Sequence, residues 1–248
     1  MAAGKIYIGT SGYHYSHWEK GVFYPSNLPK SKKLEYYIRF FDTVELNVTF
    51  YRLPQEKAFL SWYKRTPTHF LFAIKGSRFI THIKRLKEPH ESLTRFFDRA
   101  TKLREKLGVV LWQMPPAYKS NLERLRNFCE ALTPWLQYRH AFEFRHPSWF
   151  NPEIYQLVKS FNMSVCHVDW PGLKVEVPTD FSFIYLRRHG PPEERLYTGC
   201  YSPKDIQRDA DFVKKQAEQG KDVFVYFNND AFGHAVRNAL ALKKLVGL

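Results

Sequence analysis

The chain has 248 residues, of which 44% are hydrophobic, and its 38 Lys and Arg against 24 Asp and Glu give a formal net charge of +14. This composition fits one domain with a substantial core and excludes a disordered chain. The positive charge favours polyanionic partners such as nucleic acid, nucleotides or sugar phosphates, although a merely solubilising role fits equally well.

Eight apolar segments alternate with helical segments along the chain. Several are nearly continuous apolar runs, such as 109–112 and 223–227, which are typical of parallel strands buried on both faces. The expected strands are residues 5–9, 43–47, 70–75, 108–113, 139–144, 164–168, 182–187 and 222–227. This alternation predicts a single α/β domain, a (β/α)8 barrel of the TIM type that spans residues 1–248.

Helix boundaries are marked by characteristic residues. Ser120 and Glu123 have the spacing of a capping box, and Asn151 and Ser202 each precede a proline, as N-cap residues often do. Glycine is expected just after two helices, at Gly108 and Gly220.

Two regions depart from a regular barrel. Only about a dozen residues separate the sixth and seventh strands, near the minimum for a parallel crossover. Because residues 171–178 contain two prolines and a glycine, we expect the helix there to be missing or replaced by a loop. The long loops 10–30, 75–90 and 187–201 lie on the catalytic side, and their aromatic and basic content favours a function.

The carboxyl ends of barrel strands form the active face, so the polar residues that follow each strand are candidate site residues. After the first strand, the hydroxyls of Thr10 and Ser11 and the neighbouring glycines could bind an anion or form a plain turn. Tyr13 and Trp18 could stack on a base or sugar, or they could plug the barrel mouth.

Acidic residues end three strands. With a period of two, Glu45 and Asn47 share one face of their strand, as do Glu143 and Arg145, and we expect these side chains to point into the barrel. By the same parity His167 is grouped with Asp169 at the end of the sixth strand.

Glu45, Glu143 and Asp169 are therefore the predicted catalytic residues. Together with His167 they would suit a divalent-metal site or a general acid–base set. The alternative is a buried ion network in which arginine or lysine neutralises the carboxylates. The sequence does not decide between these two interpretations, and it does not show whether a metal is required.

The loop 75–87 carries five basic residues, one histidine and no acid. With Arg187, Arg188, His189 and Arg195 it could form a positive rim that binds phosphate. The polar residues after the last strand could cap a helix or hold a phosphate. The predicted substrate-binding residues are Thr10, Ser11, Tyr13, Trp18, Asn47, Lys75, His82, Arg145, His146, Arg187, Asn228, Asn229 and Asp230.

Six motifs are spread in order over nearly the whole chain. They are GTSGY at 9–13, TVELN with TFYRLP at 43–54, ITH at 80–82, QMPP at 113–116, EFRHPSW at 143–149 and YFNND at 226–230. In this combination they resemble the YecE-like family, known as domain of unknown function 72. The resemblance implies a TIM-type barrel and no established reaction.

The likeness of such barrels to endonuclease-IV-like and xylose-isomerase-like folds suggests nucleic acid as a ligand, by analogy of fold alone. This chain departs from those endonucleases because it lacks an abundance of histidine and acidic ligands for their three-metal cluster.

The leading hypothesis is an enzyme that acts on a phosphate-bearing substrate such as nucleic acid or a nucleotide, with phosphodiester hydrolysis as the reaction. The alternatives are a non-catalytic nucleic-acid-binding protein and a sugar or sugar-phosphate isomerase or hydrolase. Three widely spaced cysteines and no long apolar run predict a cytoplasmic protein with reduced thiols and no membrane partner, and we expect a monomer.

Overall fold

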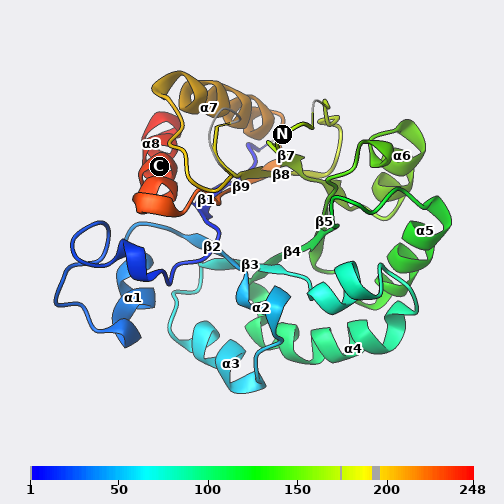
Figure 1. Ribbon diagram of the computed structural model, residues 1–248, viewed down its shortest axis with the longest axis horizontal. Helices are drawn as coiled ribbons and strands as arrows, with labels where there is room; N and C mark the ends of the chain where they lie inside the picture. The colour runs from blue at the N-terminus through cyan, green and yellow to red at the C-terminus, as the bar shows by residue number, and fades with distance from the viewer. Residues whose placement is uncertain (1, 174, 192–195) are drawn as a thin grey trace.

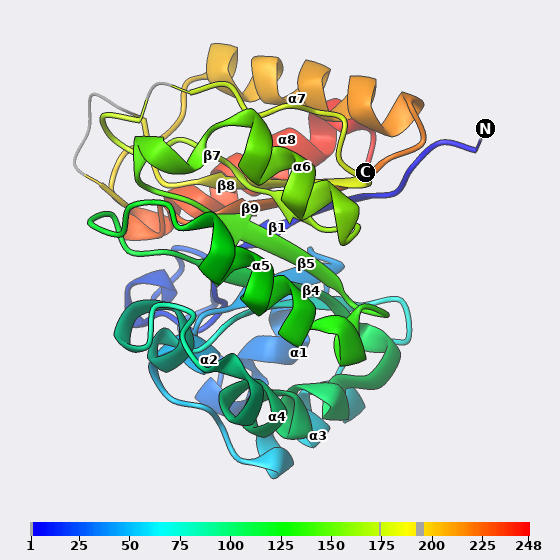
Figure 2. The same cartoon turned by 90° about the vertical axis from the view of Figure 1, so that its right-hand side faces the viewer.

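The structure is a computed structural model that describes residues 2–173, 175–191 and 196–248. Strands lie at the centre of the molecule and the longer helices surround them (Figures 1 and 2). The expected α/β class is confirmed. Within the described residues, no helix is both long enough and apolar enough to cross a membrane.

The strands form two parallel sheets. One sheet has the order β1 (Ile6–Thr10), β9 (Asp222–Phe227), β8 (Phe183–Arg188), β7 (His167–Val168). The other has the order β2 (Thr43–Leu46), β3 (Leu71–Lys75), β4 (Leu107–Gln113), β5 (Arg139–Glu143), β6 (Ser164–Val165). All eight expected strand segments form strands, although the expected strand 164–168 is divided between β6 and β7.

The helices between the strands vary in length. The α-helices are α1 (Lys33–Tyr37), α2 (Val48–Tyr51), α3 (Glu56–Lys64), α4 (Pro89–Ala100), α5 (Leu122–Ala131), α6 (Pro152–Ser160), α7 (Pro203–Glu218) and α8 (His234–Val246). Shorter turns of helix are η1 (Ser16–Trp18), η2 (Lys30–Lys32), η3 (Phe79–Ile83), η4 (Thr101–Lys106), η5 (Thr133–Trp135), η6 (Pro147–Trp149) and η7 (Ala231–Gly233). Between β7 and β8, residues 169–173 and 175–182 contain no helix, as predicted.

The buried side chains form two clusters, because alternate residues of each strand face opposite sides of the sheet. Val44, Leu46, Phe142 and Phe144 pack in a large cluster with the helices, which confirms the predicted parity of β2 and β5. A smaller cluster joins alternate residues of neighbouring strands: Ala73, Val109, Leu111, Ala141, Cys166, Phe183, Tyr185, Phe224 and Tyr226.

His167 does not point towards the predicted site. Cys166 belongs to the smaller central cluster and Val168 packs against it, so His167 faces the other way. Its ring lies 5.3 Å from that of Phe212 in α7, measured between centroids. Burial lowers the pKa of His167 to about 3. The prediction that His167 and Asp169 share the inward face is therefore wrong for His167.

Three expected helix boundaries are confirmed and two are wrong. The side chains of Asn151 and Ser202 accept hydrogen bonds from the backbone three residues on, and Gly220 has a positive φ of 83°. Gly108 instead lies inside β4, because the preceding η4 ends at Lys106. The N-cap of α5 is Asn121 rather than Ser120, whose backbone N–H is bonded to Ser148.

We predict that Asn121→Ala lowers the free energy of unfolding by about 1 kcal/mol, since Asn121 Oδ1 accepts the backbone N–H of Arg124 at 2.8 Å. Ser120→Ala is the matched control and should change it by less than about 0.5 kcal/mol. Urea unfolding of both variants measures the difference. A larger loss in the Ser120 variant would contradict the assignment of the cap.

Candidate functional site

A pocket of about 610 Å³ opens where β1, β2, β3, β8 and β9 end. Its polar lining includes Lys75, Arg187, two asparagines (Asn47 and Asn228) and Asp230. Aromatic rings form much of the remaining wall: Tyr13, Tyr15, Tyr51, Trp62 and Tyr197. The pocket therefore combines cations, amides and flat apolar surfaces on the face that the strand pattern predicts as active.

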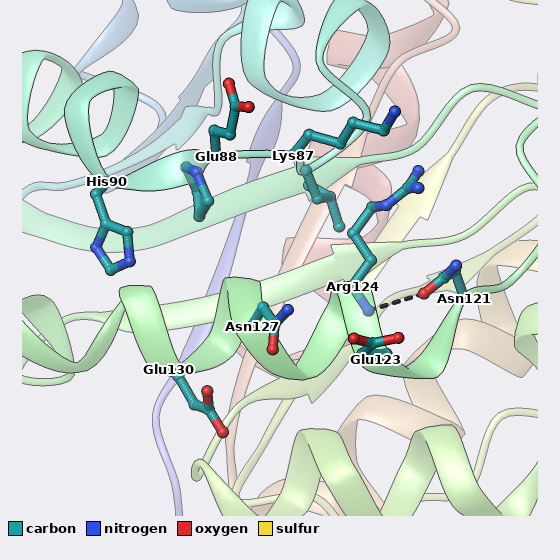
Figure 3. Close-up of a pocket in the computed structure, with 10 residues that line it drawn as sticks. Lys87, Glu88, His90, Asn121, Glu123, Arg124, Asn127 and Glu130 are labelled. Atoms are coloured by element: carbon teal, nitrogen blue, oxygen red, sulfur yellow. Dashed lines mark hydrogen bonds between the residues drawn. The ribbon is translucent and has the colours of Figure 1, made fainter.

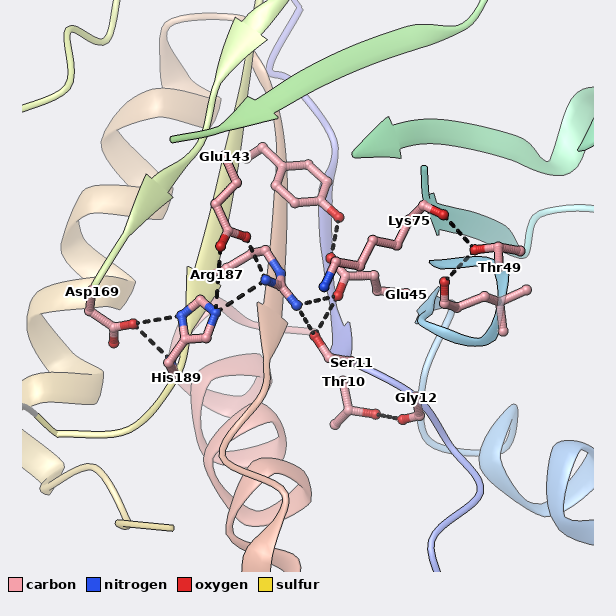
Figure 4. Close-up of polar contacts among 12 residues, drawn as sticks. Thr10, Ser11, Gly12, Glu45, Thr49, Lys75, Glu143, Asp169, Arg187 and His189 are labelled. Atoms are coloured by element: carbon pink, nitrogen blue, oxygen red, sulfur yellow. Dashed lines mark hydrogen bonds and ion pairs between the residues drawn. The ribbon is translucent and has the colours of Figure 1, made fainter. Parts of the chain in front are cut away.

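Arg187 lies between two carboxylates at the base of this pocket (Figure 4). Its Nη1 donates to Glu143 Oε2 at 2.5 Å and its Nη2 to Glu45 Oε1 at 2.8 Å. Only 1% of the residue is exposed, and the two carboxylates hold the pKa of the guanidinium well above its usual value despite the opposing effect of burial. The side chain is thus a fixed positive charge.

Glu45 and Glu143 are both fully buried, with an exposed fraction of 0%. Glu45 also accepts hydrogen bonds from Ser11 Oγ at 2.6 Å and from the Tyr185 hydroxyl at 2.7 Å. Arg145 Nε donates to Glu143 Oε1 at 2.6 Å. Burial alone would raise the pKa of Glu143, but Arg145 and Arg187 hold it well below its usual value.

This pairing argues against direct acid–base work by the two glutamates. Neither lies on the pocket wall. Glu143, whose pKa is held well below its usual value, is also a weak base. The buried ion network that the sequence left as an alternative is the arrangement observed. In it, Glu45 and Glu143 position Arg187 and Arg145.

Asp169 joins the same network through a histidine. His189 Nδ1 lies 3.2 Å from Asp169 Oδ1, while Nε2 lies 3.1 Å from Arg187 Nη1 and 3.4 Å from Arg145 Nη2. Because arginine can only donate, Nε2 accepts and Nδ1 carries the proton. Burial lowers the pKa of His189, in keeping with a neutral ring. The Arg145 guanidinium also lies over the ring of Trp170, 3.6 Å from its centroid.

Lys75 is the last residue of β3 and lines the pocket, yet only 8% of it is exposed. Its Nζ lies 4.0 Å from the centroid of the Phe50 ring. In the described part of the chain this amine has no hydrogen bond and no ion pair. Burial and then the charge of Arg187 lower the pKa of Lys75 to about 7.

His82 lies behind the pocket wall rather than on it. Its Nδ1 is 2.9 Å from Thr81 Oγ1, and its Nε2 is 3.3 Å from Gln113 Nε2. Burial and then the charge of Lys75 lower the pKa of His82 to about 4. The predicted contact of His82 with substrate is therefore not provided by this geometry.

The first loop contributes less to the pocket than expected. Thr10 Oγ1 donates to the Gly12 carbonyl at 2.6 Å, and Ser11 is bonded to Glu45, so neither hydroxyl is available for an anion. Trp18 is 0% exposed, and its indole N–H donates to the Asp230 carbonyl at 2.7 Å. Trp18 is thus part of the plug and cannot stack on a ligand, whereas Tyr13 does line the pocket.

Of the three residues predicted after the last strand, Asn228 and Asp230 line the pocket and Asn229 does not. Asn229 is fully buried and donates to the Gly199 carbonyl and to Asn238. Burial raises the pKa of Asp230, whose carboxylate lies 3.0 Å from His17 Nε2. Asn229 therefore ties loops together instead of binding substrate.

Two further predictions about charged residues change. His146 caps η6 by accepting the Ser148 N–H at 3.2 Å and does not line the pocket. Arg188 pairs with Asp209 in α7 at 2.6 Å and 2.7 Å, so it is absent from the rim. Arg195 lies outside the described residues. Arg187 alone of the predicted β8 cations lines the pocket.

Sequence reasoning missed the part of the aromatic wall formed by Tyr51, Trp62 and Tyr197. Tyr51 follows β2 closely, and its place beside Asn47 could have indicated a role. Trp62 comes from α3, and its indole donates to the Tyr13 hydroxyl at 3.1 Å, a contact that no local pattern predicts. Among the described residues, no group of three or more His, Cys, Asp or Glu is placed to hold a metal ion.

Two of the other surface hollows are lined in part by residues of the loop 75–90. One, of about 590 Å³, lies between residues 86–90 and α5 and contains none of the predicted site residues (Figure 3). The other, of about 550 Å³, is lined by a cluster of four basic side chains and one acid: Arg52, Lys84, Arg95, Arg99 and Glu91. Arg52 directly follows Tyr51, so this basic hollow adjoins the aromatic wall.

Comparison with known proteins identifies relatives that match all or part of the chain. The UPF0759 protein YunF of Bacillus subtilis is 29% identical over 279 aligned residues, which cover 98% of this chain and 95% of that protein. The UPF0759 protein YecE of Escherichia coli is 29% identical over 147 residues, 58% of this chain and 50% of that one. D-psicose 3-epimerase from Clostridium cellulolyticum shares only the fold, with a TM-score of 0.59 at 8% identity and 98% of each chain covered.

A crystal structure of a DUF72 family protein from Thermotoga maritima has a TM-score of 0.86 to this structure, at 31% identity, covering 98% of this chain and 100% of that one. The family described as "Protein of unknown function DUF72" matches residues 7–248. The chain therefore belongs to the DUF72 family, as the six sequence motifs indicated.

Proposed function

We propose that the protein is an enzyme that cleaves a phosphate ester in a nucleic acid or nucleotide-like substrate, bound in the pocket at the strand ends. The observation that carries this proposal is the placement of Lys75 and Arg187 beside a wall of aromatic rings. Cationic groups bind phosphate oxygens, and aromatic rings stack on bases or sugars without requiring one sequence.

The charges of the pocket favour an anion. The pKa of Lys75 falls to about 7 through burial and the charge of Arg187, and the pKa of His82 falls to about 4 through burial and the charge of Lys75. Burial and neighbouring positive charge thus disfavour the protonated forms of both Lys75 and His82. A bound phosphate would offset that repulsion.

The basic hollow beside the pocket favours a polymer over a single nucleotide. Its four cations outnumber its one acid, and Arg52 continues directly from Tyr51 on the pocket wall. A strand with its end in the pocket could extend its phosphates over this hollow. Exposed Tyr51 and Phe79 flank the route, with exposed fractions of 71% and 46%.

We also propose that the two sheets close into one barrel, which would fix the pocket walls relative to one another. At one edge, Ser11 forms a parallel bridge with Glu45, and the Gly12 N–H donates to the Glu45 carbonyl at 2.7 Å. At the other edge, Ser164 Oγ donates to the Phe183 carbonyl at 2.9 Å. These bonds join β1 to β2 and β6 to β8.

The test is the affinity of Lys75→Met for a 5′-phosphorylated single-stranded oligonucleotide at pH 6, where Lys75 is charged. We expect binding about tenfold to a hundredfold weaker than in the wild type, the loss of one charge-assisted hydrogen bond. Lys244→Met, an exposed residue at the end of α8, removes the same charge as a control and should bind normally.

Equal affinity in the two variants would refute the assignment of the pocket. Product formation is followed in the same samples by separating the oligonucleotide fragments. Tight, salt-sensitive binding without any product would instead support the alternative of a non-catalytic nucleic-acid-binding protein.

A further inference from the structure

We propose that Lys75 is a nucleophile that forms a Schiff base with a substrate carrying an aldehyde or ketone as well as a phosphate. The inference rests on the proposed function for the phosphate and adds the second reactive group of the substrate. Lys75 occupies the end of β3, with its amine towards the centre of the site (Figure 4).

Other buried lysines of this chain show what a structural lysine looks like. Lys33 is 1% exposed, and its Nζ pairs with Glu19 at 2.7 Å. Lys106 is 3% exposed, and its Nζ donates to the carbonyls of Tyr63 and Thr66, both at 2.6 Å. Each buried ammonium therefore has acceptors that balance its desolvation.

Lys75 lacks such acceptors. Among the described residues, its Nζ has no hydrogen-bond or ion-pair partner and lies against the ring of Phe50. Two carboxylates of the network act on its charge but are committed to arginine. A lysine that is buried beside another cation and left without acceptors is the arrangement that activates an amine for attack. The pocket gives a ligand access to that amine.

The protonation state supports the same conclusion. Only the neutral amine has a free electron pair, and at a pKa of about 7 roughly half of the Lys75 amines are neutral at pH 7. An exposed lysine with a pKa of about 10.4 has roughly one neutral amine in a few thousand at that pH. Lys75 is thus prepared for nucleophilic attack under neutral conditions.

The reaction needs no oxidant or reductant. The Nζ electron pair attacks the carbonyl carbon, a C–N bond forms, and the carbonyl electrons move to oxygen. The nitrogen gives up two protons, the oxygen leaves with two as water, and a C=N bond remains. Protonation of that imine makes it an acceptor for electrons from a neighbouring carbon, which is the usual benefit of lysine in covalent catalysis.

Pyridoxal 5′-phosphate is a suitable probe because it carries both groups. The wild-type protein is mixed with the probe, the imine is reduced with borohydride, and the modified lysines are identified by peptide mass spectrometry. We expect Lys75 to be labelled at least about tenfold faster than any other lysine at pH 7, with Lys33 and Lys106 unlabelled. The rate at Lys75 should rise with pH through the pKa of its amine, above which the amine is neutral.

Two analogues separate this inference from the proposed function. Pyridoxal, which has no phosphate, should label Lys75 at least about tenfold more slowly because it lacks one charge-assisted contact. Pyridoxine 5′-phosphate, which has no aldehyde, should slow labelling by competing for the pocket. If pyridoxal reacts as fast as its phosphate, the Schiff-base inference stands and the phosphate site fails.

If pyridoxine 5′-phosphate binds but no reduced adduct forms at Lys75, the Schiff-base inference is overturned while the phosphate site stands. If Lys75 reacts no faster than exposed lysines, the inference is likewise overturned. Lys75→Arg keeps the charge but removes the amine, and it should form no adduct at position 75. Because the labelling itself uses the wild-type protein, the result does not depend on that variant folding.

Discussion

Arg187→Met is expected to lower the free energy of unfolding by at least about 3–5 kcal/mol, because it leaves two buried carboxylates without their shared partner. Arg187 is 1% exposed, and Glu45 and Glu143 are both 0% exposed, so water cannot replace the lost guanidinium without a rearrangement. Urea unfolding at pH 7 measures the loss.

Arg208→Met provides the matched control. Arg208 pairs with Asp205 at 3.0 Å on the surface of α7, with 75% of its side chain exposed. Such a pair contributes less than about 1 kcal/mol. The double variant R187M/E143Q should lose less than the sum of its two single variants, since the two residues are in contact. A loss of less than 1 kcal/mol in Arg187→Met would contradict the account of the network.

Glu143→Gln is expected to destabilise the protein by about 3–5 kcal/mol at pH 7, because Arg145 and Arg187 both lose a buried carboxylate. It should also change the response to acid. The pKa of Glu143 is held well below its usual value in the folded state, whereas that of an unfolded glutamate is about 4.3. The stability that ionised Glu143 contributes is therefore fully present above about pH 5, and it is lost progressively as the pH falls below that value.

Stability measured from pH 7 down to pH 3 tests this prediction. The wild type should lose stability steeply below about pH 5, and the variant should lose less over the same interval. Glu218→Gln, at the exposed end of α7, should follow the wild-type curve within about 0.5 kcal/mol. Parallel curves for Glu143→Gln and the wild type would show that Glu143 does not carry this pH dependence.

The strands could be predicted because their signal is local. Apolar runs such as 223–227 and the turn residues between them depend on neighbours in sequence. The inward orientation of Glu45 and Glu143 could also be predicted, because successive side chains of a strand point to opposite faces of the sheet. The prediction for His167 failed because Cys166 and Val168 face the central cluster, so His167 between them faces outward. β7 ends at Val168, and the parity counted back from Asp169 starts outside the strand.

Whether a site residue is paired or buried could not be predicted in the same way, because its partners lie far away in the sequence. Glu45 is neutralised by Arg187, 142 residues further along the chain. Nothing near Glu45 indicates whether that partner is present. The burial of Trp18 likewise depends on Asp230, 212 residues away. The sequence could place these residues at one end of the strands, but it could not distinguish a reactive carboxylate from a paired one.

The carbonyl of Asp230 accepts hydrogen bonds from both Trp18 and His17, which join the first loop to the last. During synthesis on a ribosome, the chain emerges from its N-terminus, so the aromatic loop appears long before the residue that anchors it. A nascent chain that stops short of β9 has neither this anchor nor the parallel partner of β1. Ligand binding should therefore begin only after residue 230 has left the exit tunnel, and the pocket is among the last parts of the molecule to become functional.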